Sequence, residues 1–311
     1  MACRDANGGN LALYQVLDYL TITSHLLQPN LSFYALSRNP IFHLNFSAMN
    51  DQTALITGAS NGIGFELARC FARDDYRVVL VARHLDELKE AARLLHQEFG
   101  GVDIVLLPFD LSRPETPEQI YAETTKRGFQ IDALVNDAGF GETGYFTDTD
   151  MQTELDIIQV NATSLVHLTK LYLRDMVARN EGRILQLGSV ASFTPSPCQA
   201  VYAATKAFVL SFAEAVQHEL KQKKSAVTMT ILCPPPTATN FFHVAHAEDT
   251  WAANHAASPR EVAQQGYDAL MDGAARSLPT ISAKVNFFSS LLLPDSVLAT
   301  LMNTQLHPTN K

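Results

Sequence analysis

A regular alternation of strand-like and helix-like segments begins at Asp51 and constrains the fold of this 311-residue chain more than any other feature. Apolar, β-rich runs predict strands at 53–57, 77–82, 102–107, 131–135, 183–188 and 226–232. Amphipathic stretches between them predict helices at 65–73, 85–99, 118–126, 150–160, 163–179 and 200–222. Strands that alternate with helices pair in parallel through right-handed crossovers. The sequence therefore predicts an α/β fold with a doubly wound, Rossmann-like parallel sheet in a single domain spanning residues 49–311.

Residues 1–48 lack this alternation and are predicted to be an N-terminal extension of unknown role. The stretch 11–27 is moderately amphipathic and suits a helix. A transit peptide and a functional start at Met49 are the two alternatives, and the two arginines of this segment decide neither.

The charge and the cysteine content limit which partners the protein can bind and which cellular compartment suits it. The net charge is −9 and no cluster of Lys and Arg interrupts it, so a nucleic-acid-binding surface is not expected. Cys3, Cys70, Cys198 and Cys233 are scattered without a Cys-x-x-Cys pair, which predicts a reduced, cytoplasmic setting. No uninterrupted apolar run reaches the length of a transmembrane helix.

Tyr202 and Lys206 stand four residues apart in the predicted helix 200–222. At that spacing the two side chains leave the same face of a helix. An ammonium beside a phenol favours the phenolate, so the pKa of Tyr202 is predicted to fall from about 10 toward the range of a general acid or base. Ser189 follows the predicted strand 183–188, so it lies where the carboxyl end of a strand opens onto a site. The pairing of Tyr and Lys is common in helices, and the catalytic interpretation depends on the rest of the chain.

Three glycines, Gly58, Gly62 and Gly64, fall between the first predicted strand and the first predicted helix. Glycine lets backbone N–H groups approach a phosphate at a helix N-terminus. The spacing G-x-x-x-G-x-G differs from the commoner dinucleotide fingerprint, but its place in a βαβ unit favours a phosphate-binding loop. Arg83 follows the second strand, where a cation attracts the 2′-phosphate of NADP. NADP is therefore the preferred cofactor, with NAD as the alternative.

Together these stretches resemble the short-chain dehydrogenase/reductase family over roughly residues 51–272. The motifs that carry the resemblance are Thr57-Gly-Ala-Ser-Asn-Gly-Ile-Gly64, Asp110, Asn136-Asp-Ala-Gly139, Asn161, Ser189, Tyr202-x-x-x-Lys206 and Pro234-x-x-x-x-Thr239. The interval of 13 residues from Ser189 to Tyr202 also matches the family. Chance is not a serious alternative for so many motifs in the right order.

The resemblance implies a role for each catalytic residue. Tyr202 would donate a proton to a carbonyl or accept one from an alcohol, and Ser189 would hydrogen-bond the substrate oxygen. Lys206 would hold the nicotinamide ribose and lower the pKa of Tyr202. Asn161 would position a water molecule that links Lys206 to solvent. Ser192 is interpreted as structural, because its separation from Tyr202 fits the family less well.

The resemblance also implies which residues bind the dinucleotide. Asp110 would contact the adenine, and Thr239 the nicotinamide end. The full predicted set is Gly58, Ser60, Asn61, Gly62, Ile63, Gly64, Arg83, Asp110, Asn136, Ala138, Gly139, Tyr202, Lys206, Pro234, Thr237 and Thr239.

Two positions depart from the family pattern. Asp137 stands where the family usually has a second asparagine, and a buried carboxylate beside a cofactor must be hydrogen-bonded or protonated. Pro235 stands where the family usually has glycine, and proline fixes φ and lacks an N–H, so the backbone beside the nicotinamide must differ locally. Thr237 and Thr239 keep the family spacing, which favours a loop that has adapted to the proline.

The expected function is that of an NADPH-dependent carbonyl reductase or alcohol dehydrogenase, which transfers hydride to or from an apolar ketone, aldehyde or acyl-type substrate. The segments 136–141 and 233–242 are similar to bacterial-type, broad-substrate reductases of ketones and acyl chains. The alternative is a catalytically weak dinucleotide-binding sensor or scaffold of the same fold, suggested by Asp137 and Pro235. The complete catalytic set favours the enzyme.

Two apolar segments are expected to shape the substrate pocket and one helix the assembly. Residues 240–257 are predicted to form a lid and residues 284–303 a cap, with contact to a membrane surface as the less favoured alternative for the cap. No metal site is expected from the ligand-type side chains of the lid, which are His243, His246, Glu248 and His255. Helix 200–222 is apolar on more than one face, so it is predicted to pair with another subunit, together with helix 163–179, in a homodimer or homotetramer.

Overall fold

A parallel sheet of seven strands forms the centre of the computed structural model, which describes residues 51–306. The strands are β1 (Thr53–Thr57), β2 (Arg77–Ala82), β3 (Ile104–Pro108), β4 (Ile131–Asn136), β5 (Arg183–Leu187), β6 (Thr228–Leu232) and β7 (Arg276–Ser277). They pair in the order β3-β2-β1-β4-β5-β6-β7, and every pair is parallel. From β1 in the middle of the sheet, the chain runs outward to β3 and then returns to β4. The predicted doubly wound α/β fold is therefore confirmed.

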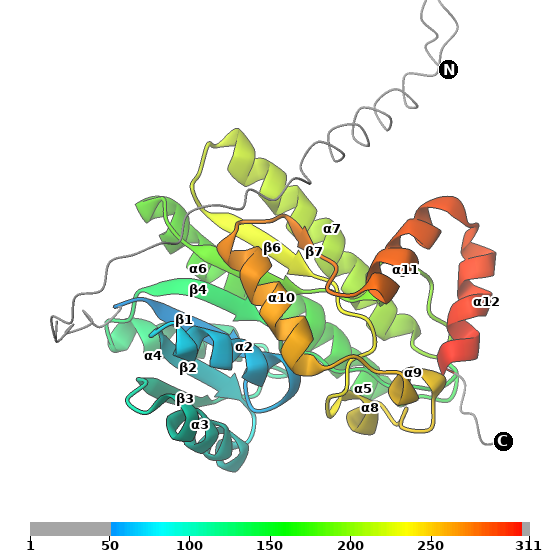
Figure 1. The fold of residues 1–311 in the computed structure, drawn as a ribbon, viewed down its shortest axis with the longest axis horizontal. Coiled ribbons are helices and arrows are strands. Elements are labelled where there is room, and N and C mark those ends of the chain that lie inside the picture. The colour runs from blue at the N-terminus through cyan, green and yellow to red at the C-terminus, as the bar shows by residue number, and fades with distance from the viewer. Residues whose placement is uncertain (1–50, 307–311) are drawn as a thin grey trace, which may run out of the picture. The chain divides into compact units, whose positions relative to one another are not determined.

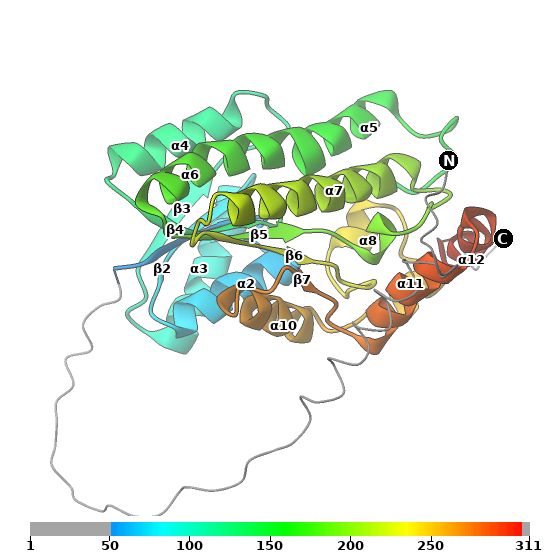
Figure 2. The ribbon, with the colours of Figure 1, turned by 90° about the horizontal axis from the view of Figure 1, so that it is seen from above.

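Helices cover both faces of this sheet (Figures 1 and 2). One face carries α2 (Gly62–Arg73), α3 (Leu85–Phe99) and α10 (Pro259–Met271). The other carries α4 (Thr116–Lys126), α5 (Met151–Ile158), α6 (Leu165–Arg179) and α7 (Ala200–Gln222). Beside the carboxyl edge of the sheet stand α8 (Phe241–Val244), α9 (Trp251–Asn254), α11 (Ile281–Leu292) and α12 (Asp295–Leu306). Within residues 51–306 no helix has both the length and the apolar character needed to cross a bilayer.

The strands divide their side chains between two cores, because successive residues of a strand point to opposite faces. Ile56 and Leu80 pack in the core beneath α2, α3 and α10, whereas their neighbours Leu55 and Val79 pack in the core beneath α4, α6 and α7. Burial on both faces explains why the strands read as continuous apolar runs and not as alternating ones.

The predicted interruption between helices 150–160 and 163–179 is wrong. The chain stays helical from α5 into α6 through a π-helical turn, η2 (Gln159–Ser164). No glycine or proline breaks this stretch, so one continuous helix is compatible with the sequence. A π turn accommodates an extra residue and often occurs at a functional site.

The prediction lacks α10 and β7, and it starts α2 three residues too late. α10 has a readable signal, because Pro259 occupies its first turn and Val262, Ala263 and Tyr267 are buried at helical spacing. β7 has only two residues, so the sequence shows no strand periodicity there. It is recognised as a strand because it pairs with β6. α2 begins at Gly62, so the later glycines of the loop belong to the first turn of the helix.

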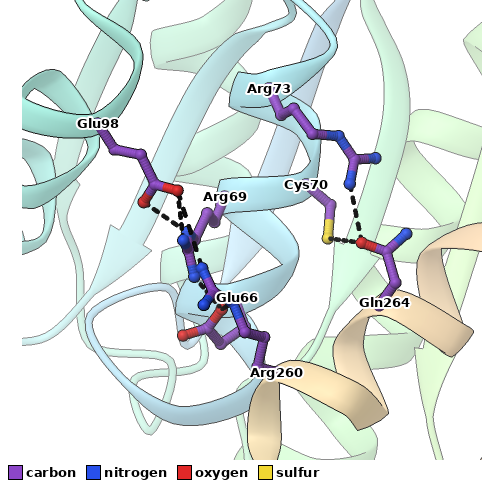
Figure 3. Close-up of polar contacts among 7 residues, drawn as sticks. All are labelled: Glu66, Arg69, Cys70, Arg73, Glu98, Arg260 and Gln264. Atoms are coloured by element: carbon purple, nitrogen blue, oxygen red, sulfur yellow. Dashed lines mark hydrogen bonds and ion pairs between the residues drawn. The ribbon is translucent and has the colours of Figure 1, made fainter.

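Polar contacts join α2 to its neighbours on the side away from the sheet (Figure 3). Arg69 donates from Nε to Glu98 at the end of α3 (2.6 Å). Arg73 donates to Gln264 of α10 (2.8 Å), and Arg260 of α10 lies 3.8 Å from Glu98. Exposed pairs of this kind add little stability each, but their geometry orients α2 against both helices.

The predicted extension, residues 1–48, lies outside the described residues.

Candidate active site

A cavity of about 470 Å³ opens at the carboxyl edge of the sheet, near the β1–β4 junction where the strand order reverses. Doubly wound sheets bind their ligands at this position. The predicted site residues that line the cavity are Gly58, Ser60, Asn61, Gly62, Ile63, Arg83, Asp110, Ala138, Gly139, Ser189, Tyr202, Pro234, Thr237 and Thr239. The fold thus brings segments far apart in the sequence to one cavity.

The remaining predicted residues, Gly64, Asn136, Asn161 and Lys206, are buried and do not line the cavity. Asn136 donates from Nδ2 to Thr169 Oγ1 (3.0 Å) and to Gln186 Oε1 (3.1 Å). This network ties β4 to β5 and α6. The Asn136 side chain is thus directed into the protein, and the cofactor contact of this residue stays a prediction.

The N-terminus of α2 faces the cavity through Gly62 and Ile63. Gly62 has φ +61°, and a Cβ there would lie 2.9 Å from the Thr239 methyl group, so the glycine is required twice over. Asn61, at the N-cap, makes no side-chain capping hydrogen bond. The first N–H groups of a helix attract anions, and this turn presents them to the cavity.

Thr57 fixes the end of β4 against the end of β1. Its Oγ1 accepts the N–H groups of Asp137 (3.1 Å) and Ala138 (3.0 Å) and donates to the Val135 carbonyl (3.3 Å). One hydroxyl therefore sets the path of the chain that enters the cavity wall. Thr57 was part of the recognised motif but not of the predicted site.

Asp137 is buried between this strand end and α2. Its Oδ2 would lie 2.6 Å from a Cβ added to Gly64, and Gly64 donates its backbone N–H to the carboxylate. Its Oδ1 is buried without a hydrogen-bond partner. Burial raises the pKa of Asp137 to about 7, and Lys206 and the Gly64 N–H oppose that rise. The sequence predicted that this buried carboxyl group would be hydrogen-bonded or protonated, and only Oδ2 has a hydrogen bond.

Asn161 clamps the loop that follows β4. From the π turn η2, its Oδ1 accepts the Phe140 N–H (3.1 Å) and its Nδ2 donates to the Phe140 carbonyl (3.0 Å). Nδ2 also donates to Thr205 Oγ1 of α7 (3.1 Å). The clamp positions the cavity wall between β4 and α7, and the water-positioning role stays a prediction.

Ser189 begins a short 3₁₀ turn, η3 (Val190–Ser192), directly after β5. Its Oγ accepts the Ala191 N–H (3.1 Å), and its own N–H donates to Ser192 Oγ (3.1 Å). The acceptor bond orients the Ser189 hydroxyl and leaves its O–H able to donate. Ser192 does not line the cavity, in agreement with a structural role.

Tyr202 and Lys206 leave the same face of α7, as predicted, but the expected effect on the phenol is wrong. Burial raises the pKa of Tyr202 to about 12, with Ser189 lowering it and Asp137 raising it further. The Lys206 ammonium donates to the Leu187 carbonyl (2.8 Å) and lies 5.7 Å from the centre of the Tyr202 ring. Burial also lowers the pKa of Lys206 to about 8, and Asp137 opposes this shift. Desolvation therefore dominates over the attraction between the two side chains.

The three-proline segment 234–236 forms part of the cavity wall. Its carbonyls accept, in order, the Val190 N–H (3.0 Å), the Thr237 hydroxyl (2.8 Å) and the Ala257 N–H (2.8 Å). Because all three carbonyls are hydrogen-bonded, the structure favours a loop whose backbone has adapted to Pro235.

The cavity has two ends of different character. The glycine-loop end consists of Gly58 and residues 60–63 with Arg83 and Asp110. Ser60 donates there to Glu87 Oε2 (3.0 Å). The sequence interpretation missed Glu87, whose only signal is its place in the first turn of α3.

The apolar end consists of Phe241, Phe242, Val244, Ala252 and Met302, which come from the predicted lid and cap. The Phe241 ring lies 5.1 Å from the Tyr202 ring. The prediction gave these segments but not these residues, since only packing selects them.

The polar side chains of the lid engage one another and their own backbone. His243 Nδ1 lies 2.6 Å from Glu248 Oε1, and His255 Nδ1 lies 3.0 Å from the Trp251 carbonyl oxygen. In residues 51–306 no group of three or more His, Cys, Asp or Glu side chains is placed to hold a metal ion.

Comparison with known proteins gives this arrangement its family. The model of the short chain dehydrogenase family matches residues 52–250. The chain belongs to the short chain dehydrogenase family. The 11-beta-hydroxysteroid dehydrogenase-like 3 of Arabidopsis thaliana is 30% identical to this dehydrogenase over 238 residues, which are 72% of this chain and 75% of that protein.

Two further proteins extend the comparison. Very-long-chain 3-oxoacyl-CoA reductase of Mycosarcoma maydis is 32% identical over 178 residues, 57% of this chain, and the matched part spans about half (51%) of that relative's length. A short-chain dehydrogenase from Sphingobium yanoikuyae, solved in complex with NADPH, is 27% identical with a TM-score of 0.68, over 84% of this chain and 98% of that one. This dehydrogenase is thus an oxidoreductase acting on a CH–OH or C=O group with a nicotinamide dinucleotide.

The cavity fits such a dinucleotide. Its glycine-loop end presents a helix N-terminus to a pyrophosphate, with Arg83 and Asp110 beyond it. Ser189 and Tyr202 line the same cavity toward its apolar end, where a nicotinamide and a substrate would meet. Residues of this chain are therefore placed to contact the pyrophosphate, the adenosine side and the nicotinamide side of a bound dinucleotide.

Proposed function

We propose that this short-chain dehydrogenase reduces the carbonyl group of an apolar ketone, aldehyde or acyl-type substrate with NADPH. The observation that carries the proposal is the position of Tyr202. Its phenol lies against Ser189, and its ring contacts Phe241 at the apolar end of the cavity. A burial-raised pKa keeps this phenol protonated at neutral pH, which suits a proton donor.

The protein residues divide the work of the reduction. The dinucleotide supplies the hydride to the carbonyl carbon when it is bound. Tyr202 gives its proton to the carbonyl oxygen, and the Ser189 hydroxyl donates a hydrogen bond to the same oxygen as negative charge develops there. Lys206, held by the Leu187 carbonyl, keeps a positive charge beside Tyr202. Asn161 holds the cavity wall through Phe140.

The preference for NADPH over NADH rests on Arg83. This residue is exposed at the end of β2 and lines the glycine-loop end of the cavity. A guanidinium attracts a phosphate through both charge and paired hydrogen bonds. Glu87 belongs to the same end, but Ser60 already donates to its carboxylate. The similar dehydrogenase from Sphingobium yanoikuyae was solved with NADPH.

The apolar character of the substrate rests on the five side chains of the apolar end. Such a lining desolvates a hydrocarbon body but offers it few hydrogen bonds. Two relatives are named for a hydroxysteroid and for a very-long-chain 3-oxoacyl thioester. Both names describe molecules in which a large apolar body carries a CH–OH or C=O group that can be oxidised or reduced.

The test combines binding with turnover. Equilibrium titration with NADPH and NADH should give the tighter dissociation constant for NADPH. A panel of a steroid ketone, a long-chain 3-oxoacyl thioester and a short polar aldehyde should then show NADPH oxidation with the two apolar substrates. Binding without turnover on the whole panel would instead support the alternative, a dinucleotide-binding sensor or scaffold.

We further propose a homodimer or homotetramer. Met151, Leu155 and Ile158 follow one face of α5 and are exposed, as is Phe208 of the adjacent α7. An apolar face of this kind favours a partner subunit. α6, expected to share the interface, exposes no large apolar side chain, so α5 takes its place beside α7.

Sedimentation at micromolar concentration tests the assembly. Leu155→Lys should yield monomers, whereas Leu291→Lys on α11, which changes an even more exposed leucine elsewhere (65% against 50%), should not. A monomeric wild-type protein would contradict the proposal. The cytoplasmic setting predicted from the cysteines stays a prediction.

A further inference from the structure

Asp137 occupies a place where a negative charge conflicts with the cofactor. It lines the cavity at the end of β4, and its Oδ2 accepts the N–H of Gly64 in the first turn of α2. This turn is where the pyrophosphate of a dinucleotide would bring two further negative charges. The carboxylate thus competes with the cofactor for the same positive end of the helix.

The two oxygens of Asp137 differ in their surroundings. Oδ2 is held by the Gly64 N–H and lies within 3.0 Å of a Cβ built on Gly58, so the glycine loop fits closely around it. Oδ1 is buried and has no hydrogen-bond partner. An unpartnered, buried carboxylate oxygen is costly when charged and is the natural place for a proton.

We propose that the dehydrogenase takes up one proton on Asp137 when the dinucleotide binds, so that Asp137 sets cofactor affinity as a function of pH. The proton comes from solvent and bonds to Oδ1, and no other bond changes. The neutral acid no longer repels the pyrophosphate, while Oδ2 keeps the Gly64 N–H. The inference rests on dinucleotide binding at this site and not on the identity of the substrate.

The neighbouring elements define the other charges that act on this group. α7 contributes Lys206, which favours the Asp137 carboxylate, and Tyr202, which is neutral at ordinary pH. The end of β6 contributes Cys233, which interacts with Lys206. The segment 57–64 has no ionisable side chain.

Because the pKa of Asp137 lies near neutral pH, the dependence of cofactor affinity on pH can be measured under ordinary conditions. The pKa of Asp137, about 7 by burial, places it half-charged at neutral pH in this structure. A bound pyrophosphate favours the neutral acid, so the pKa of Asp137 rises in the complex. Above pH 7, affinity then falls by roughly tenfold per pH unit, because each binding event must recruit a scarcer proton.

Infrared difference spectroscopy on protein labelled with ¹³C-aspartate tests the proton directly. At pH 8, addition of NADPH to the wild type should produce the carbonyl stretch of a protonated aspartic acid. Asp137→Asn should lack the band. Asp86→Asn, which removes an equal charge from a side chain that is 96% exposed on α3, should keep it. NADH should give the same band, since it shares the pyrophosphate.

Binding constants measured between pH 6 and 8 provide the second readout. Asp137→Asn should bind NADPH about tenfold more tightly than the wild type at pH 8 and about equally at pH 6. Tight binding by the wild type at pH 8 without the band would overturn the proton uptake while leaving the proposed function intact. Absence of NADPH and NADH binding at every pH would overturn both.

Discussion

At the glycine-loop end of the cavity, backbone approaches backbone, whereas at the apolar end the wall consists of side chains from separate helices. A Cβ on Gly64 would meet the Gly58 carbonyl and the Asp137 carboxylate. At the apolar end, Phe241 of α8 and Met302 of α12 both line the cavity, although they are about sixty residues apart in the sequence. Backbone contacts tolerate almost no substitution, but side-chain contacts tolerate changes that preserve volume.

This difference in construction corresponds to a difference in role between the two ends of the cavity. The glycine-loop end and the residues around Tyr202 hold the part of the reaction that all members of the family share. The apolar end belongs to α8, α9 and α12, and α11, which contacts α12, exposes Ile281 and Leu292 at 80% and 82%. We therefore expect substitutions to act on cofactor binding and chemistry at one end and on substrate selection at the other.

The largest effect is expected for Tyr202→Phe, at the boundary between the two ends. Removal of the hydroxyl deletes the proton donor, so kcat should fall by about a thousandfold. The ring and its contact with Phe241 remain, so the dissociation constant for NADPH should change little. Steady-state kinetics and equilibrium binding check both statements, and near-native turnover would remove Tyr202 from the mechanism.

Gly64→Ala probes the tightness of the glycine-loop end. The new methyl group would clash with the Gly58 carbonyl oxygen and lie 2.6 Å from Asp137 Oδ2, so the loop at Gly58 or α2 must move. Overpacking of this size costs about 1–3 kcal/mol, so NADPH affinity should fall by up to roughly a hundredfold. Gly101→Ala, where a Cβ meets nothing within 4 Å, is the matched control and should bind normally. Equal affinities in the two variants would show that this end is not built from close backbone approach.

Arg83→Asp tests the outermost part of the same end. Attraction for a 2′-phosphate becomes repulsion, so the ratio of NADPH to NADH affinity should shift toward NADH by more than tenfold. Arg93→Asp makes the same change on α3 at a residue that does not line the cavity, and should leave the ratio in place. The two titrations are measured side by side. An unchanged ratio in the Arg83 variant would assign the preference to another residue.

The smallest effect is expected for Phe241→Ala, at the apolar end. Loss of one aromatic contact with Tyr202 should lower kcat/KM for an apolar ketone by about fivefold, chiefly through KM. NADPH affinity should stay within twofold, roughly the limit for a residue outside the cofactor contacts. Ile281→Ala, on the exposed face of α11, serves as the control. A variant that loses NADPH binding as well would contradict the separation of the two ends.

The glycine-loop end and the position of Tyr202 were largely predictable from the sequence, because the motifs that define them are local. Gly58, Gly62 and Tyr202 stand in short motifs whose spacing reflects one strand, one turn or one helix. The alternation of these elements also dictated the parallel sheet. Most of the predicted site residues accordingly line one cavity.

The tertiary structure decided what depends on burial and on distant neighbours. Asn136 is directed toward Thr169 and Gln186, which no spacing in the sequence reveals. The pKa of Tyr202 rises because desolvation outweighs the nearby Lys206, and only a packed structure sets that balance. Local motifs thus determined where the backbone runs, while the charge state of Asp137 and the lining of the apolar end follow from solvent exclusion by segments that meet only in the folded chain.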